Sequence, residues 1–340
     1  MVRLGNLLPT SHYLPWLPMR NQFVSSVFTL QSDVGPGECP LSSRMAEANA
    51  SGHPVNGVDL VRLIKQLVAV VAVTVLGGVA ANIVGGNGVL ALLAGLITAT
   101  LTLLVYRVVV RRTENRPVAE VSPTGAVRAL GLGALIGIGL FSLAIAAIAL
   151  LGGYAVDGLG SPGALLGLLG LMAAAAVTEE VIFRGVLFRV VEERTGSWIA
   201  MAITGLVFGL MHLLNPNASL FGAIAIAVEA GFMLTAAYMA TRRLWVPIGL
   251  HFGWNIAAGG IFSTEVSGAN TPQGLLDATM SGPVLLTGGD FGPEGSVFSI
   301  AICILAGAIF VWMAHRRGTI LPPRNRRQVP EDSRPVLAEG

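Results

Sequence analysis

The sequence predicts an all-α polytopic membrane protein, a bundle of about eight transmembrane helices around an intramembrane polar cavity. Hydrophobic residues make up 53% of the 340 residues and charged residues only 12%, about half the charge content of a soluble domain. The mean hydropathy is +0.72. Charges are also missing from several stretches that are long enough to cross a bilayer, which takes about 20 apolar residues. This composition argues against a disordered chain, a coiled coil or a nucleic-acid-binding protein.

The charge-free stretches define the expected helices. The first stretch holds 41 residues between Lys65 and Arg107, and a Gly-Gly-Asn-Gly turn at 85–88 divides it into two helices. An Asn-Pro-Asn turn at 215–217 divides a later stretch in the same way. The eight expected spans are 66–84, 89–107, 129–152, 163–190, 198–214, 219–241, 245–262 and 296–315.

Basic residues fall on one side of these spans. With a cytoplasmic N-terminus, the inner segments contain Arg62, Lys65, Arg107, Arg111, Arg112, Arg116, Arg128, Arg189, Arg194, Arg242, Arg243, Arg316 and Arg317. The outer loops then contain only the acidic residues Asp157, Glu265, Asp277, Asp290 and Glu294. Since cytoplasmic loops retain Lys and Arg, we predict a multi-pass protein of the cell membrane with both termini in the cytoplasm.

Composition divides the chain into three expected parts. Residues 1–60 contain no apolar run long enough to span and predict a disordered cytoplasmic extension, and residues 318–340 predict a solvated cytoplasmic tail. Between them, 61–317 forms the expected transmembrane domain. The extension lacks the features of a signal peptide, and Met45 is an alternative start.

A few ionisable side chains lie inside the expected spans, where each costs about 2.5–3.5 kcal/mol on insertion scales and is by default a functional candidate. These are Glu179, Glu180, Arg184, His212, Glu229 and His251. Asn255 is added because its amide shares a helix face with His251. For Glu229 we favour a polar contact with a neighbouring helix over a catalytic role.

Glu180 and Arg184 are four residues apart, so they share one helical face and can form an ion pair. Glu179 is rotated from that pair by about 100°. Both carboxylates could simply balance Arg184 at a helix end. The alternative is that the second carboxylate is left over and works as a general base.

The expected hairpin between the fourth and fifth spans places two of these residues at the same distance from its turn. If it turns near 195–196, Glu179 and His212 each lie 16 residues from the turn, or about 24 Å. His251 lies only eight residues after Arg243, so it joins them only if the seventh helix starts deeper.

One carboxylate and two imidazoles can activate a water molecule for attack on a carbonyl, and an amide N–H can stabilise the oxyanion. Peptide-bond hydrolysis is therefore the expected chemistry. Glu179, His212 and His251 would also supply the ligands of a catalytic zinc site, but HExxH is absent, so zinc is optional. Neither a G-x-S-x-G elbow nor a nucleotide-binding phosphate loop is present.

Three motifs carry a family resemblance. Glu179-Glu180 with Arg184 forms EExxxR, Phe208 with His212 forms FxxxH, and His251 with Asn255 forms HxxxN. In this order on three apolar helices, they resemble the CPBP intramembrane proteases (CAAX proteases and bacteriocin-processing enzymes), also called the Abi family. The resemblance covers about 165–300, roughly 40% of the chain.

The resemblance implies a CAAX-type intramembrane endopeptidase that cleaves membrane-associated or lipidated peptides. It implies that Glu179 is the general base assisted by His212, and that His251 and Asn255 stabilise the oxyanion. The supporting residues would be Glu180, Arg184 and Phe208. The family is often described as metalloproteases, but a metal-free glutamate mechanism is also entertained. Membrane lipid and a peptide or protein substrate are the expected partners, with no nucleic acid or nucleotide, and no role is carried onto 263–295.

Two other function classes remain open from the residues alone. A non-catalytic membrane protein could use the polar set for bacteriocin immunity or to scaffold a partner. A transporter could use buried Glu and His as a proton relay, although this does not explain the order of the three motifs. Substitution of Glu179 by Gln separates them, because only a protease would lose cleavage.

Overall fold

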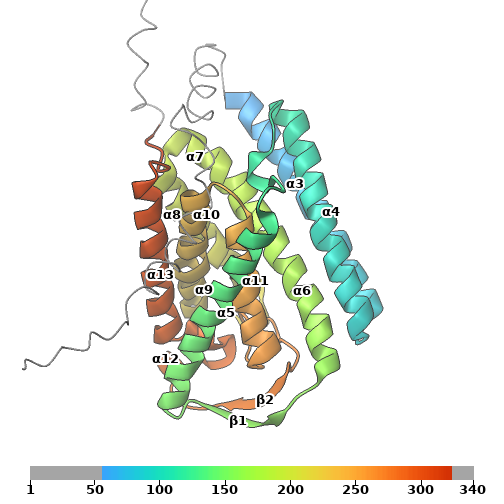
Figure 1. Cartoon of the computed structure of the whole chain (residues 1–340), viewed down its shortest axis with the longest axis vertical. Helices are drawn as coiled ribbons and strands as arrows, with labels where there is room; N and C mark the ends of the chain where they lie inside the picture. Colours follow the sequence, from blue (N-terminus) through green and yellow to red (C-terminus); the bar gives the residue numbers. More distant parts are fainter. Residues whose placement is uncertain (1–55, 324–340) are drawn as a thin grey trace, which may run out of the picture. The chain divides into compact units, whose positions relative to one another are not determined.

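The computed structural model describes residues 56–323. Most of the predicted N-terminal extension (1–60) and of the predicted C-terminal tail (318–340) therefore lies outside the described residues. Figure 1 shows a bundle of helices, which confirms the all-α polytopic fold class.

Among residues 56–323, eight helical passes form the bundle, and several of them consist of consecutive segments. The passes are α3 (Asn56–Val84), α4 (Gly88–Glu114), α5 (Ala126–Leu150), α6–η3–α7 (Pro162–Glu180, Val181–Phe188, Arg189–Thr195), α8–η4 (Ser197–Met211, His212–Leu214), α9–η5–α10 (Leu220–Ile226, Ala227–Leu234, Thr235–Thr241), α11–η6 (Trp245–Asn255, Ile256–Ile261) and α13 (Val297–Arg316). Within the described range, seven of them are long and apolar enough to cross a membrane, the exception being α11–η6. A short 3-10 turn, η2 (Ala119–Val121), lies between α4 and α5.

The expected turns follow from local backbone chemistry. Gly85 has φ +58°, a conformation that glycine adopts without steric cost, and the Asn87 side chain caps α4 by accepting a hydrogen bond from the Leu90 N–H at 3.1 Å. Gly196, with φ +79°, separates α7 from α8. The predicted turns at 85–88 and 195–196 are confirmed.

The first and last described helices meet the same turn of the bundle. At the start of α3, Arg62 pairs with Glu193 of α7 at 2.5 Å. Beyond α13, the Leu321 N–H donates to the Ser197 hydroxyl at 2.8 Å. Both ends of the described chain therefore lie beside the α7–α8 turn, as an even number of passes requires.

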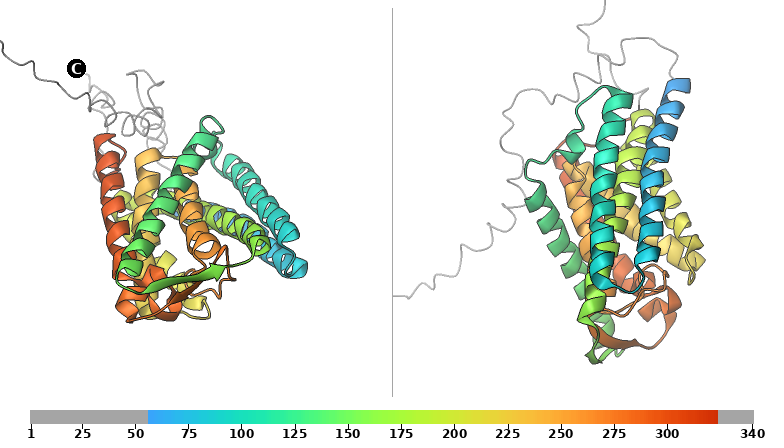
Figure 2. Two further views of the ribbon diagram at one scale, coloured as in Figure 1. Left: turned by 60° about the horizontal axis from the view of Figure 1, so that its bottom comes forward. Right: turned by 90° about the vertical axis from the view of Figure 1, so that its right-hand side faces the viewer.

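Helices α3 and α4 lie side by side at one edge of the bundle (Figure 2) and expose apolar side chains. Val68, Leu76 and Ile83 of α3 are 62%, 70% and 80% exposed. Such exposure in a helix without a polar face is that of a lipid-facing helix.

Close packing of α5 on α11 fixes the position of the HxxxN motif. A Cβ at Gly253 would lie 2.1 Å from the Ala134 carbonyl oxygen, and one at Gly249 would lie 2.1 Å from that of Leu130. Only glycine permits this approach of the two backbones. The glycines alternate with His251 and Asn255 along α11, so the motif side chains lie on the helix face opposite α5, and packing on α5 fixes the position of their backbone.

The segment between η6 and α13, expected as an outer loop, contains a strand and short helices. Strand β2 (Leu276–Met280) pairs antiparallel with β1 (Tyr154–Leu159), and three short helices follow: α12 (Val284–Thr287), η7 (Gly289–Phe291) and η8 (Pro293–Gly295). The segment contains buried side chains, among them Ser267 and Glu294. It therefore covers one end of the bundle's interior.

Candidate active site

The EExxxR motif forms a buried ion pair at the end of α6. Arg184 Nη1 donates to Glu180 Oε1 at 2.8 Å, and the two residues are 1% and 0% exposed. Arg184 also donates to the Ala230 carbonyl at 2.5 Å and to the Thr235 hydroxyl at 3.3 Å. The predicted pairing of Glu180 with Arg184 is confirmed, and it connects this helix to α9–η5–α10.

His251 lies between the two carboxylates of the same motif. Its Nδ1 is 3.0 Å from Glu180 Oε1, and its Nε2 is 3.8 Å from Glu179 Oε2. Glu180 is an acceptor already paired with Arg184, so Nδ1 donates its proton to Glu180. Glu179 Oε2 is buried and receives no hydrogen bond from residues 56–323. The His251 imidazole therefore lies between Glu180, which is already hydrogen-bonded to Arg184, and Glu179, whose buried Oε2 accepts no hydrogen bond in the described range.

The FxxxH motif places its imidazole by a local hydrogen bond. His212 Nδ1 is 2.8 Å from the Phe208 carbonyl oxygen, which only accepts, so Nδ1 carries the proton and Nε2 presents a lone pair. The Phe208 ring is 4.9 Å from the His212 ring and 6.3 Å from the His251 ring, measured between centroids. One buried phenylalanine thus separates the two imidazoles.

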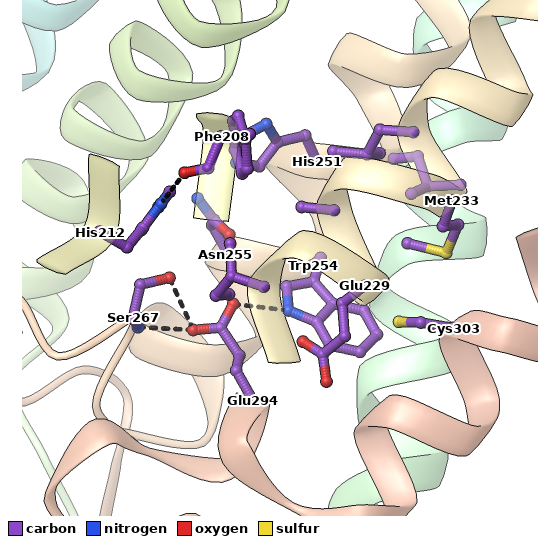
Figure 3. A pocket seen from close by; sticks show the side chains of 14 residues that line it. Phe208, His212, Glu229, Met233, His251, Trp254, Asn255, Ser267, Glu294 and Cys303 are labelled. Carbon is purple, nitrogen blue, oxygen red and sulfur yellow. Dashed lines mark hydrogen bonds between the residues drawn. The ribbon is translucent and has the colours of Figure 1, made fainter. Parts of the chain in front are cut away.

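His212, His251 and Asn255 line one cavity (Figure 3), whose volume of about 20 Å³ accommodates one water molecule. The Asn255 side chain makes no hydrogen bond within the described range, although the residue is only 7% exposed. Its amide group is therefore free to bind a group inside the cavity.

The structure does not bring every expected pair together. Glu179 reaches the cavity only through its contact with His251 and is not among the lining residues. In residues 56–323, no hydrogen bond or ion pair links Glu179 to His212, because α8 packs mainly against η5 rather than along α6. The equal distances of both residues from the α7–α8 turn therefore did not bring them within hydrogen-bond or ion-pair distance.

Two acidic residues at the other end of the cavity were not predicted as site residues. Glu229 lines it, is 2% exposed, and receives no hydrogen bond on either carboxylate oxygen from the part of the chain described. The predicted polar contact of Glu229 with a neighbouring helix is absent from that part. Glu294, from the segment after β2, accepts from Trp254 Nε1 at 2.9 Å, from Ser267 N at 2.5 Å and from Ser267 Oγ at 2.9 Å. Burial raises the pKa of the Glu294 carboxyl, and these hydrogen bonds only partly oppose that effect.

The side chains as arranged do not fit a metal centre. Across residues 56–323, no group of three or more His, Cys, Asp or Glu side chains converges on a position where an ion could be held. Both ring nitrogens of His251 face carboxylates, and Nδ1 of His212 is used by the Phe208 carbonyl. The zinc set considered from the sequence, Glu179 with His212 and His251, is therefore not assembled as a ligand set.

Comparisons with known proteins agree with the three motifs. Residues 161–257, which contain all of them, match the family described as "Type II CAAX prenyl endopeptidase Rce1-like". A Bacillus subtilis (strain 168) protein named "Putative membrane peptidase YdiL" is 33% identical over 79 residues, which are 23% of this chain and 30% of that protein. The chain thus matches less than a third of that relative's length. No solved structure matches significantly. The motif resemblance is confirmed: residues 161–257 of this multi-pass membrane protein match the CAAX prenyl endopeptidase family model, and the relative is a putative membrane peptidase.

Proposed function

We propose that the protein is an intramembrane endopeptidase that hydrolyses peptide bonds with a glutamate-activated water. One observation carries this proposal. The His251 imidazole is held between Glu180 and Glu179, 3.0 and 3.8 Å away, on the wall of a cavity that His212 and Asn255 also line. The cavity wall carries a free imidazole lone pair and a free amide, and His251 connects it to the Glu179 carboxylate, which accepts no hydrogen bond on Oε2 within residues 56–323. These are the groups that water attack on a carbonyl needs.

In the proposed mechanism, Glu179 takes a proton from water while Nε2 of His212 orients it. The water oxygen attacks the scissile carbonyl carbon, and the resulting oxyanion is stabilised by the Asn255 amide and by Nε2–H of His251. His251 can carry that second proton because it lies between two carboxylates. Glu179 then returns the proton to the leaving amine as the C–N bond breaks. Glu180, Arg184 and Phe208 keep the imidazoles in place.

We further propose that the substrates are membrane-associated or lipidated peptides and that both termini face the cytoplasm. The exposed apolar surface of α3 and α4 supports contact with lipid. The name of the matched family, a CAAX prenyl endopeptidase, supports a lipidated peptide. The one-sided distribution of Lys and Arg supports the orientation.

The test compares the native chain with Glu179→Gln on a panel of lipidated and bacteriocin-precursor peptides. Loss of the general base is expected to slow cleavage by about 10²- to 10⁴-fold at unchanged membrane level. Asp290→Asn, an exposed outer acid, is the matched control and should cleave normally. Cleavage by Glu179→Gln at the native rate would contradict the mechanism.

A further inference from the structure

Two buried acids, Glu229 and Glu294, lie at the far end of the cavity. Neither Glu229 nor Glu294 contacts a Lys or Arg anywhere in residues 56–323, and Arg184 is already bound to Glu180 and to the Ala230 carbonyl. Glu294 has three hydrogen-bond donors, whereas Glu229 has none on either oxygen. A buried carboxylate without a donor is costly, so Glu229 requires a partner that the described chain does not supply.

The cavity connects this acidic end to the candidate catalytic groups. Glu229 and Glu294 line the same space as His212, His251 and Asn255, and Figure 3 shows the two acids beside the Trp254 indole, on the side away from the Phe208 ring. A substrate held at the catalytic groups could therefore place a neighbouring side chain there.

The chemistry of Glu229 restricts the partner. An ammonium has three donors and no acceptor, which complements the two unbonded oxygens of Glu229. Lysine presents this charge as a compact group on a flexible stem, whereas the planar guanidinium of arginine suits bidentate recognition of one carboxylate.

We propose that Glu229, with Glu294, forms a specificity subsite that binds the ammonium group of a lysine side chain in the peptide substrate. This inference rests on the proposed peptidase function. Glu229 would make the direct contact. Glu294, fixed by Ser267 and Trp254, would add negative potential without moving.

Binding is measured on the Glu179→Gln chain, so that the readout does not depend on cleavage. The probes are a short Ala/Leu peptide with one central lysine and its versions with norleucine or glutamate at that position. Loss of one partner from a buried charge pair weakens binding by about 30-fold or more, so the lysine peptide should bind at least that much tighter than the norleucine peptide. Adding Glu229→Gln should remove the difference, and adding Asp290→Asn, which removes an exposed acid four residues before Glu294, should preserve it.

Equal affinities for the lysine and norleucine peptides would overturn the subsite, and so would a lysine preference that survives Glu229→Gln. A third contrary result concerns the buffer cation: replacing choline by sodium would strengthen the binding of both peptides equally. The last result would assign the cavity to an inorganic cation. The peptide comparison uses an intact Glu229, so it decides the matter even if Glu229→Gln does not fold. If the lysine peptide is preferred but the native chain cleaves no peptide, the peptidase function is refuted and the lysine-binding site remains. If the native chain cleaves peptides without a preference for lysine, the peptidase function remains and the lysine-binding site is refuted.

Discussion

Replacing Arg184 by Met should destabilise the protein more than any exposed substitution. Arg184 is 1% exposed, pairs with Glu180 at 2.8 Å and donates to the Ala230 carbonyl and the Thr235 hydroxyl. Removing one member of a buried ion pair leaves an uncompensated charge and costs about 3–5 kcal/mol. Since folded proteins are stable by about 5–15 kcal/mol, this is a large share of the total.

The double variant Glu180→Met, Arg184→Met separates the charge effect from simple loss of contacts. Replacing both partners by apolar residues of similar size removes the stranded charge, so it should be less destabilising than Arg184→Met alone. Peptide cleavage should not return, because His251 then loses the acceptor for its Nδ1 proton.

Both variants can be measured by denaturant unfolding in detergent micelles, followed by tryptophan fluorescence. Arg112→Met, at an exposed position of α4, is the matched control and should change stability by less than about 0.5 kcal/mol. The reasoning would be refuted if Arg184→Met unfolded like the control, or if the double variant lost as much stability as the two single changes added together.

Two further predictions concern packing and pH. Gly253→Ala should lower both the thermal unfolding temperature and the cleavage rate, because the new Cβ would lie 2.1 Å from the Ala134 carbonyl oxygen. In the control Gly78→Ala, the new Cβ would have no atom within 4 Å, so the unfolding temperature and the cleavage rate should not fall. Equal unfolding temperatures for the two variants would disprove the packing argument. For Glu120, burial alone would raise the pKa of its carboxyl, but hydrogen bonds and charges from Arg116 and Arg189 outweigh burial and lower it. The stability this residue adds is therefore complete above its unfolded pKa of about 4.3 and is lost as pH falls through the lower folded value. The stability gap between the native chain and Glu120→Gln should shrink in melts below about pH 4, and a constant gap would contradict this account.

The helices could be predicted because a bilayer imposes a simple rule on the sequence. A spanning helix has to be apolar and about 20 residues long, so charge-free stretches marked the passes with little ambiguity. The pass at 245–262 is the informative exception. Its helix, Trp245–Ile261, is too short to count as a span by length, yet it carries His251 and Asn255 and is packed on α5 through its glycines.

The candidate site was only partly predictable. The i,i+4 spacing fixed the Glu180–Arg184 pair, since both residues lie on one helix. The proximity of Glu179 to His251 rather than to His212 depends on how separate helices lean, which equal distances along the chain do not determine. Glu294 was missed because a loop acid outside an expected span carries no desolvation signal in the sequence; its burial comes from long-range contacts with Ser267 and Trp254.

Within residues 56–323, the segments η3, η5 and η6 are π-helices that adjoin or contain polar side chains of the site: η3 follows Glu180 directly, η5 contains Glu229, and η6 follows Asn255. A π-turn accommodates one more residue per turn than an α-helix, so the helix continues unbroken while its later side chains point in a new direction. Deleting a single residue from such a stretch could therefore leave a helix of nearly full length whose remaining side chains are turned by about 100°. The number of residues in these stretches thus sets the direction in which each polar side chain points. Evolution could redirect such a side chain by inserting or deleting one residue, without substituting the polar residue itself.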